Sequence, residues 1–228
     1  FIAFHPEVKQ IVPSHDINKN FKLLSHLKKR YPDVEIELMV NEGCLKGCPN
    51  RIFHEMINVD KTIGINNDVL LSNSYGTLFC LSYLFKNSVE STVIGNLIFP
   101  WEIDEYKKLG INSFKFVGRD GYSSDNNYYI NAFQLYLKGV DNIKYIEDFP
   151  IFGFAHHLKS INISLIIKDY KKYMPNIKYF VKYGHLCASR CGDECRYCYT
   201  CVEKIKKIYE KKMKETEKKP HYVPACKI

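Results

Sequence analysis

Five of the nine cysteines lie within fifteen residues, in the stretch CASRCGDECRYCYTC that runs from 187 to 201. Three, three, two and two residues separate them in turn. Thiolates this close repel one another when they ionise, so the run is best explained by a bound cation that neutralises their charge. It therefore predicts a metal or cluster site with ligands from Cys187, Cys191, Cys195, Cys198 and Cys201.

A second chemically dense stretch, NEGCLKGCPNRIFHE at 41–55, follows the apolar run VEIELMV and holds Cys44 and Cys48. Soft thiolates select zinc or an iron–sulfur cluster. A structural zinc usually takes two close pairs of ligands, whereas an iron–sulfur cluster often takes three close cysteines and one remote cysteine. The spacing leaves both metals open. We expect Cys44 and Cys48 to meet the later cysteines around one inorganic centre.

Four charged side chains are candidates for catalysis. Arg51 and His54 are three residues apart and would share a helix face, with the arginine binding an anion and the histidine transferring a proton. The alternative is a capping arginine and a packed histidine. Glu42 would orient a ligand or act as a base, or else it is a solvated loop acid. Arg119 suits a two-pronged contact with a carboxylate, or else an ordinary ion pair.

The elements that must position these residues follow from an alternation of short apolar runs with helical patterns. Strands are predicted at 10–14, 34–40 and 111–119, and helices at 18–31 and 100–110. Further helices and strands are predicted along the chain between these stretches. Strands separated by single helices, with apolar residues that barely alternate, indicate a parallel sheet covered by helices.

Polar side chains recur just after the predicted strands, at 14–16, 41–44 and 119–120. In parallel barrels the loops at the carboxyl ends of the strands open onto one face, where sites are built. We therefore expect these stretches to share one site.

Composition sets the class of protein. A chain of 228 residues with 46% hydrophobic content can bury a full core. Its net charge of +8 permits RNA or a carboxylate or phosphate substrate as a partner, although the eight lysines and four glutamates at 203–219 are more simply a solvated helical face. An odd number of clustered cysteines suits a disulfide framework poorly. With no long apolar run and no secretory signal at its start, the chain is expected to be cytoplasmic and away from membranes.

The stretch VNEGCLKGCPNRIFHE resembles the collagenase-like peptidase family of class U, number thirty-two, in its Asn-Glu-Gly-Cys loop, its Cys-Pro and its Phe-His. Two later stretches agree with this resemblance. FPWEIDEYKKLGINSFKFVGRD is similar to the family's helix that leads to a strand ending in Gly-Arg, and CGDECRYC is similar to its C-terminal cysteine cluster. The resemblance covers most of residues 11–201.

The fold that the resemblance implies is an α/β barrel of the TIM type, incomplete at its N-terminus because the family's first strands would lie upstream of Phe1. The chain would then divide into the C-terminal part of a barrel at 1–122, a helical layer at 123–186, and a cysteine-rich segment with a basic helix at 187–228.

The function that the resemblance implies is redox chemistry, since relatives carry a four-iron four-sulfur cluster. They support oxygen-independent hydroxylation of a ubiquinone precursor or of RNA bases, with prephenate as an oxygen donor. By similarity, Cys44 or Cys48 would join cysteines of the 187–201 run on one cluster, and we expect the cluster to be reached by Cys44, Cys48, Cys191, Cys195 and Cys198. We expect an oxygen-independent hydroxylase, or a subunit of one that pairs with another protein. The alternative is a zinc-stabilised module that binds RNA or a protein. A peptidase is less expected, because the chain has no Gly-x-Ser-x-Gly nucleophile motif.

Overall fold

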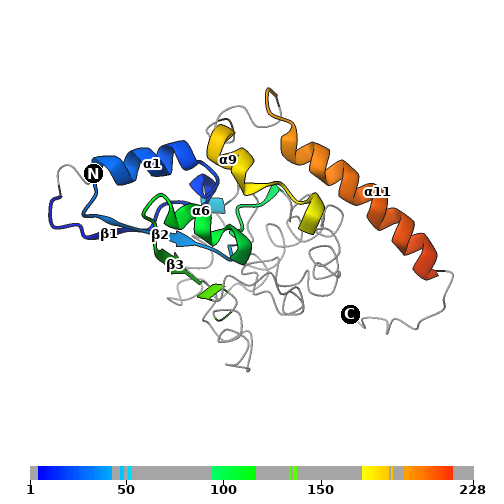
Figure 1. Cartoon of the computed structure of the whole chain (residues 1–228), viewed down its shortest axis with the longest axis horizontal. Coiled ribbons are helices and arrows are strands. Elements are labelled where there is room, and N and C mark those ends of the chain that lie inside the picture. Colours follow the sequence, from blue (N-terminus) through cyan, green and yellow to red (C-terminus); the bar gives the residue numbers. More distant parts are fainter. Residues whose placement is uncertain are drawn as a thin grey trace, which may run out of the picture.

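The computed structural model describes residues 5–42, 47–48, 51–52, 94–116, 134, 136–137, 171–184, 186 and 193–217 (Figure 1). The elements predicted between 53 and 93 and most of the predicted helical layer lie outside these residues. So do five of the candidate site residues, Cys44, His54, Arg119, Cys187 and Cys191.

Three short parallel strands form the sheet: β1 (Gln10–Ile11), β2 (Glu35–Met39) and β3 (Ser113–Lys115), in the order β1-β2-β3. Gln10 pairs with Glu35, and Leu38 pairs with Phe114. The predicted parallel sheet is therefore present in the described part of the chain. Closure into a barrel, and the division of the chain into three parts, remain predictions.

Helix α1 (Phe21–Arg30) connects β1 to β2. It begins where the side chain of Asn20 accepts a hydrogen bond from the backbone N–H of Leu23, and its last turn carries three basic residues, which suit the negative end of a helix dipole. Phe21 and Leu24 are buried. The predicted helix started at 18, but residues His15–Ile17 form a separate 3-10 turn, η2, capped by Ser14.

Helix α6 (Ile103–Lys107) precedes β3 and follows the 3-10 turn η3 (Pro100–Glu102). Proline begins η3, where its missing N–H costs nothing, and Gly110 ends the segment with a φ of 79°, a conformation that favours glycine. The start and stop signals read from the sequence are both confirmed.

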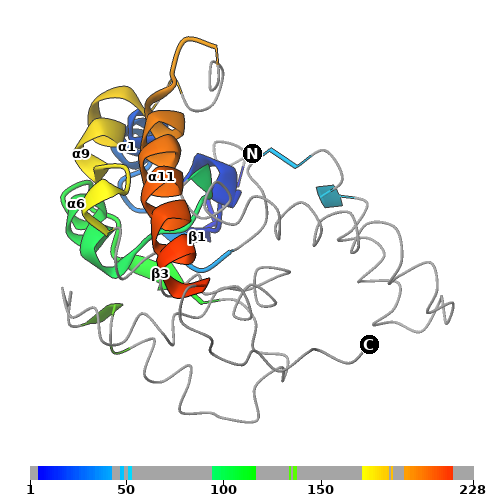
Figure 2. The same cartoon turned by 90° about the vertical axis from the view of Figure 1, so that its right-hand side faces the viewer.

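The C-terminal part contains the 3-10 turn η6 (Lys171–Tyr173) and the helices α9 (Ile177–Tyr183) and α11 (Tyr197–Glu217). Helix α9 contacts both α1 and α6, and the three lie together beside the sheet (Figures 1 and 2). The first turns of α11 bury Cys201, Val202 and Ile205 in the core, and its later turns run away from the sheet (Figure 1). None of the helices described is long and apolar enough to cross a membrane.

A buried ion pair joins the start of α1 to the start of α6. Lys19 and Glu102 contact each other through Nζ and Oε2, and they are only 7% and 2% exposed. The same Oε2 accepts a hydrogen bond of 2.9 Å from the backbone N–H of Phe99. The Lys19 ammonium also lies 5.5 Å from the centre of the Phe180 ring, so α9 completes its surroundings.

Candidate functional site

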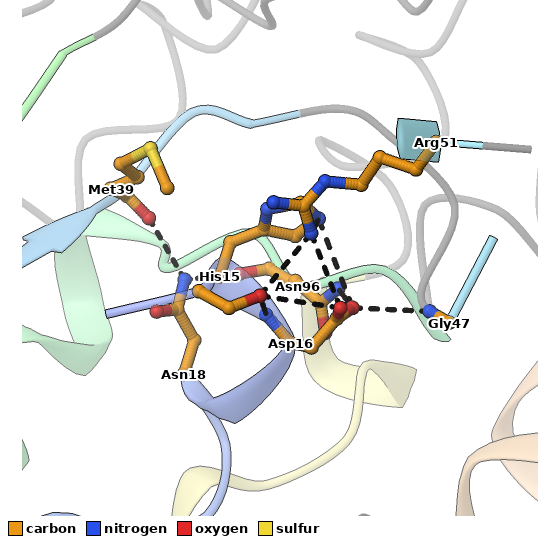
Figure 3. A network of polar contacts seen from close by, with 8 residues as sticks. His15, Asp16, Asn18, Met39, Gly47, Arg51 and Asn96 are labelled. Carbon is orange, nitrogen blue, oxygen red and sulfur yellow. Dashed lines mark hydrogen bonds and ion pairs between the residues drawn. The ribbon is translucent and has the colours of Figure 1, made fainter. Parts of the chain in front are cut away.

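A polar network lies at the carboxyl ends of the strands, where parallel α/β folds usually place their sites (Figure 3). Asp16, from the turn after β1, is at its centre. The backbone N–H of Gly47 and the side-chain amide of Asn96 donate to its Oδ1 at 3.1 and 3.0 Å. Arg51 and Ser14 donate to its Oδ2 at 3.2 and 3.3 Å. One carboxylate thus gathers residues from three separate stretches of the chain.

Two neighbours of Asp16 fix the turn on which it lies. The side-chain amide of Asn18 donates to the backbone oxygens of Met39 and Asn96, both at 2.8 Å, and so ties the turn to the end of β2 (Figure 3). His15 is 1% exposed, and its Nε2 lies 3.5 Å from Nη1 of Arg51. The carboxylate is therefore held on a rigid support.

Gly47 has a φ of 62°, a left-handed conformation that other residues adopt at a cost. The turn at this position aims the Gly47 N–H at Asp16. The glycine that the sequence places just before Cys48 therefore has a specific role in the network.

The environment of Asp16 favours its charged form. Partial burial raises the pKa of this carboxyl, but the N–H of Gly47, the nearby His15 and Arg51, and the hydroxyl of Ser14 together outweigh it and leave the pKa below its ordinary value of 3.8. A carboxylate with a lowered pKa stabilises the folded state fully above the unfolded value, and this contribution is lost as the pH falls through the folded pKa.

Urea unfolding between pH 7 and pH 2.5 tests this contribution. At pH 7 the wild type should have a higher free energy of unfolding than Asp16→Asn, and the difference should narrow below about pH 4. The exposed Asp33→Asn variant controls for the loss of one negative charge. A difference that is constant over the whole range would contradict the assignment.

Four of the candidate cysteine ligands are described, and none of the four forms a disulfide. Cys195 and Cys201 are buried, whereas Cys48 and Cys198 are partly exposed. Burial raises the pKa of the Cys201 thiol, and the neighbouring Lys204 partly offsets this effect. A metal would have to displace the thiol proton in order to bind there.

Aromatic rings surround the start of α11. Tyr179 and Tyr197 stack with their ring centres 3.8 Å apart, and the hydroxyl of Tyr179 lies 3.5 Å from the sulfur of Cys195. The Tyr197 hydroxyl accepts a hydrogen bond of 2.8 Å from the backbone N–H of Asn176. Cys195 thus lies beside Tyr179, and Cys201 belongs to the core against which both tyrosines pack.

The predicted meeting of the two cysteine stretches stays a prediction. Within the described ranges, no group of three histidine, cysteine or acidic side chains is close enough to hold a metal ion. The chemistry of the donors nevertheless fits a soft metal, because none of the four described thiols is in a disulfide. A complete ligand set would need cysteines that lie outside those ranges, namely Cys44, Cys187 and Cys191.

The candidate catalytic residues have different outcomes. Arg51 lies in the network, where its Nη1 contacts Ser14 and Asp16. Glu42 lies three residues after the end of β2 and is partly exposed. The sequence did not identify Asn18 and Asn96 as members of the network. Their hydrogen-bond partners are distant in the sequence, so no local pattern marks these two residues.

Comparison of the chain with models of protein families, with curated proteins and with solved structures gives no match.

Proposed function

We propose that this chain is an iron–sulfur redox protein. The observation that carries the proposal is the set of thiols of Cys195, Cys198 and Cys201, which form no disulfide, follow one another at intervals of three residues where α11 begins, and include two that are buried. Successive residues three apart share one side of a helix, so Cys198 and Cys201 face the same way. Cysteines with such spacing and no disulfide suit a soft metal.

A four-iron four-sulfur cluster takes four cysteine ligands. We propose that they come from the five expected from the sequence, Cys44, Cys48, Cys191, Cys195 and Cys198, with Cys187 and Cys201 as further metal-binding candidates. A bound cluster would supply one-electron transfer. Burial beside Tyr179 and Tyr197 would shield it from water, which is one of the factors that set the reduction potential of such clusters.

The proposed substrate site is the carboxyl edge of the sheet. Arg51 lies there within a network of fixed hydrogen bonds, and Glu42, His54 and Arg119 are the other proposed members. Following the family resemblance, we propose an oxygen-independent hydroxylation of a small aromatic molecule or an RNA base as the reaction. A protein partner would complete the enzyme if the chain is one subunit of it.

Anaerobic purification of the full chain tests the proposal. The expected result is a brown protein with about four irons and four sulfides per chain. Cys198→Ser should lose most of the iron, and Cys226→Ser, which changes a cysteine outside the dense run, should retain it. A colourless protein without iron would contradict the proposal, and one equivalent of zinc in its place would favour the zinc-stabilised binding module.

A further inference from the structure

Gly47 and Arg51 both bind Asp16. The backbone N–H of Gly47 donates to Oδ1, and Nη1 of Arg51 donates to Oδ2 (Figure 3). These two residues flank Cys48 in the sequence, so fixing them limits where Cys48 itself can lie. The position of Cys48 therefore depends on a residue more than thirty positions away in the sequence.

Asp16 is poorly suited to proton transfer. A carboxylate offers about four acceptor sites, and Gly47, Asn96, Arg51 and Ser14 supply four donors. A general base needs a free site for the proton that it accepts, and it works best with a pKa near the working pH. Asp16 meets neither condition, although it lies at the edge where catalytic groups are expected.

We infer that Asp16 is a positioning residue that anchors Gly47 and Arg51 at the carboxyl edge of the sheet and so fixes the place of Cys48. The anchor is itself preorganised, because Asn96 and Ser14 bind the same carboxylate and Asn18 ties its turn to β2. The use of Cys48 as a cluster ligand rests on the proposed function, whereas the anchoring does not.

Alkylation of single cysteines tests the anchor. The full chain, freed of any metal and fully reduced, is treated with iodoacetamide, and the modification rate of each cysteine is followed by mass spectrometry. In Asp16→Asn, Cys48 should react about tenfold faster than in the wild type. Hydrogen bonds to a charged group are lost, and a loss of this size shifts the equilibrium between the anchored and the released position of Cys48 about tenfold. The rate at the buried Cys201 should not change, because the effect is local. Asp33→Asn removes an exposed acid of the same type and should leave both rates at their wild-type values.

A second variant separates positioning from simple electrostatics. Simple electrostatics predicts opposite effects of the two variants on the alkylation rate of Cys48. The rate would rise when the negative charge of Asp16 is removed and fall when the positive charge of Arg51 is removed. Anchoring instead predicts that Arg51→Gln also speeds the reaction of Cys48. A slower reaction in Arg51→Gln would overturn the inference, and so would a Cys48 rate in Asp16→Asn within about twofold of the wild type.

Two further outcomes are decisive. A parallel rise at Cys48 and Cys201 would show general loosening of the fold and would also overturn the inference. If instead Asp16→Asn does not fold, Arg51→Gln alone decides, since it keeps the contact between Gly47 and Asp16. A wild-type protein that contains no iron would remove the proposed function but leave this test intact.

Discussion

Gly184→Ala is expected to cost roughly 3 kcal/mol or more of the free energy of unfolding, because the added methyl group has no room. A Cβ at this position would lie 2.0 Å from the backbone oxygen of Lys19 and 2.5 Å from that of Phe180. Both atoms belong to the main chain, so neither moves without shifting α9 or the start of α1. The backbone of Gly184 has φ −60° and ψ −19°, which alanine adopts readily. Without the clash, alanine would therefore be mildly stabilising.

Gly110→Ala is the matched control. Gly110 has a φ of 79°, but the atoms nearest to a methyl group added there are in the flexible side chain of Lys28, the closest at 3.5 Å. Its cost should be that of a left-handed alanine, about 1–2 kcal/mol. Urea unfolding of both variants gives the comparison, and thermal midpoints should fall by about 2–4 °C for each kcal/mol lost. A smaller loss for Gly184→Ala than for Gly110→Ala would show that α9 does not approach α1 as described.

Local sequence patterns predicted the elements of this fold better than their contacts. The strand predicted at 34–40 is observed at Glu35–Met39, and the signals of Pro100 and Gly110 bound the predicted helix correctly. The helix predicted to start at 18 begins at Phe21, because the backbone of Asn20 is not helical and its side chain caps the first turn through the N–H of Leu23. The side chain of Asn18 instead binds Met39 and Asn96, which are distant in the sequence, and periodicity does not register such contacts.

In the site, too, the general placement of residues was predictable from the sequence, whereas their contacts were not. The sequence placed Asp16 and Arg51 in separate stretches after separate strands, and the rule that such stretches share an edge brought them near each other. Their direct contact was not predictable, since it joins side chains 35 positions apart in the sequence and no local pattern encodes it. The convergence of the cysteines remains a prediction, because Cys44, Cys187 and Cys191 lie outside the described residues.

Lys19→Met is expected to cost about 3–5 kcal/mol, because it leaves the carboxylate of Glu102 buried without a cation. The matched control is Lys108→Met, which removes the cation of a pair with Glu105 in which the lysine is 66% exposed. Surface pairs of this kind contribute less than about 1 kcal/mol. Urea unfolding at pH 7 compares the two variants, and equal losses would mean that the Lys19–Glu102 pair is solvated.

A double variant tells whether the pair itself or the packing of Lys19 carries this stability. Glu102→Gln removes the charge but keeps an oxygen that can accept the N–H of Phe99, and methionine keeps contact with the Phe99 and Phe180 rings. If the cost of Lys19→Met comes from an unpaired charge, Lys19→Met with Glu102→Gln should be more stable than Lys19→Met alone. Strictly additive losses would instead assign the stability to packing. The first result would mean that the buried carboxylate of Glu102 requires the charge of Lys19 at the point where the starts of α1 and α6 meet α9.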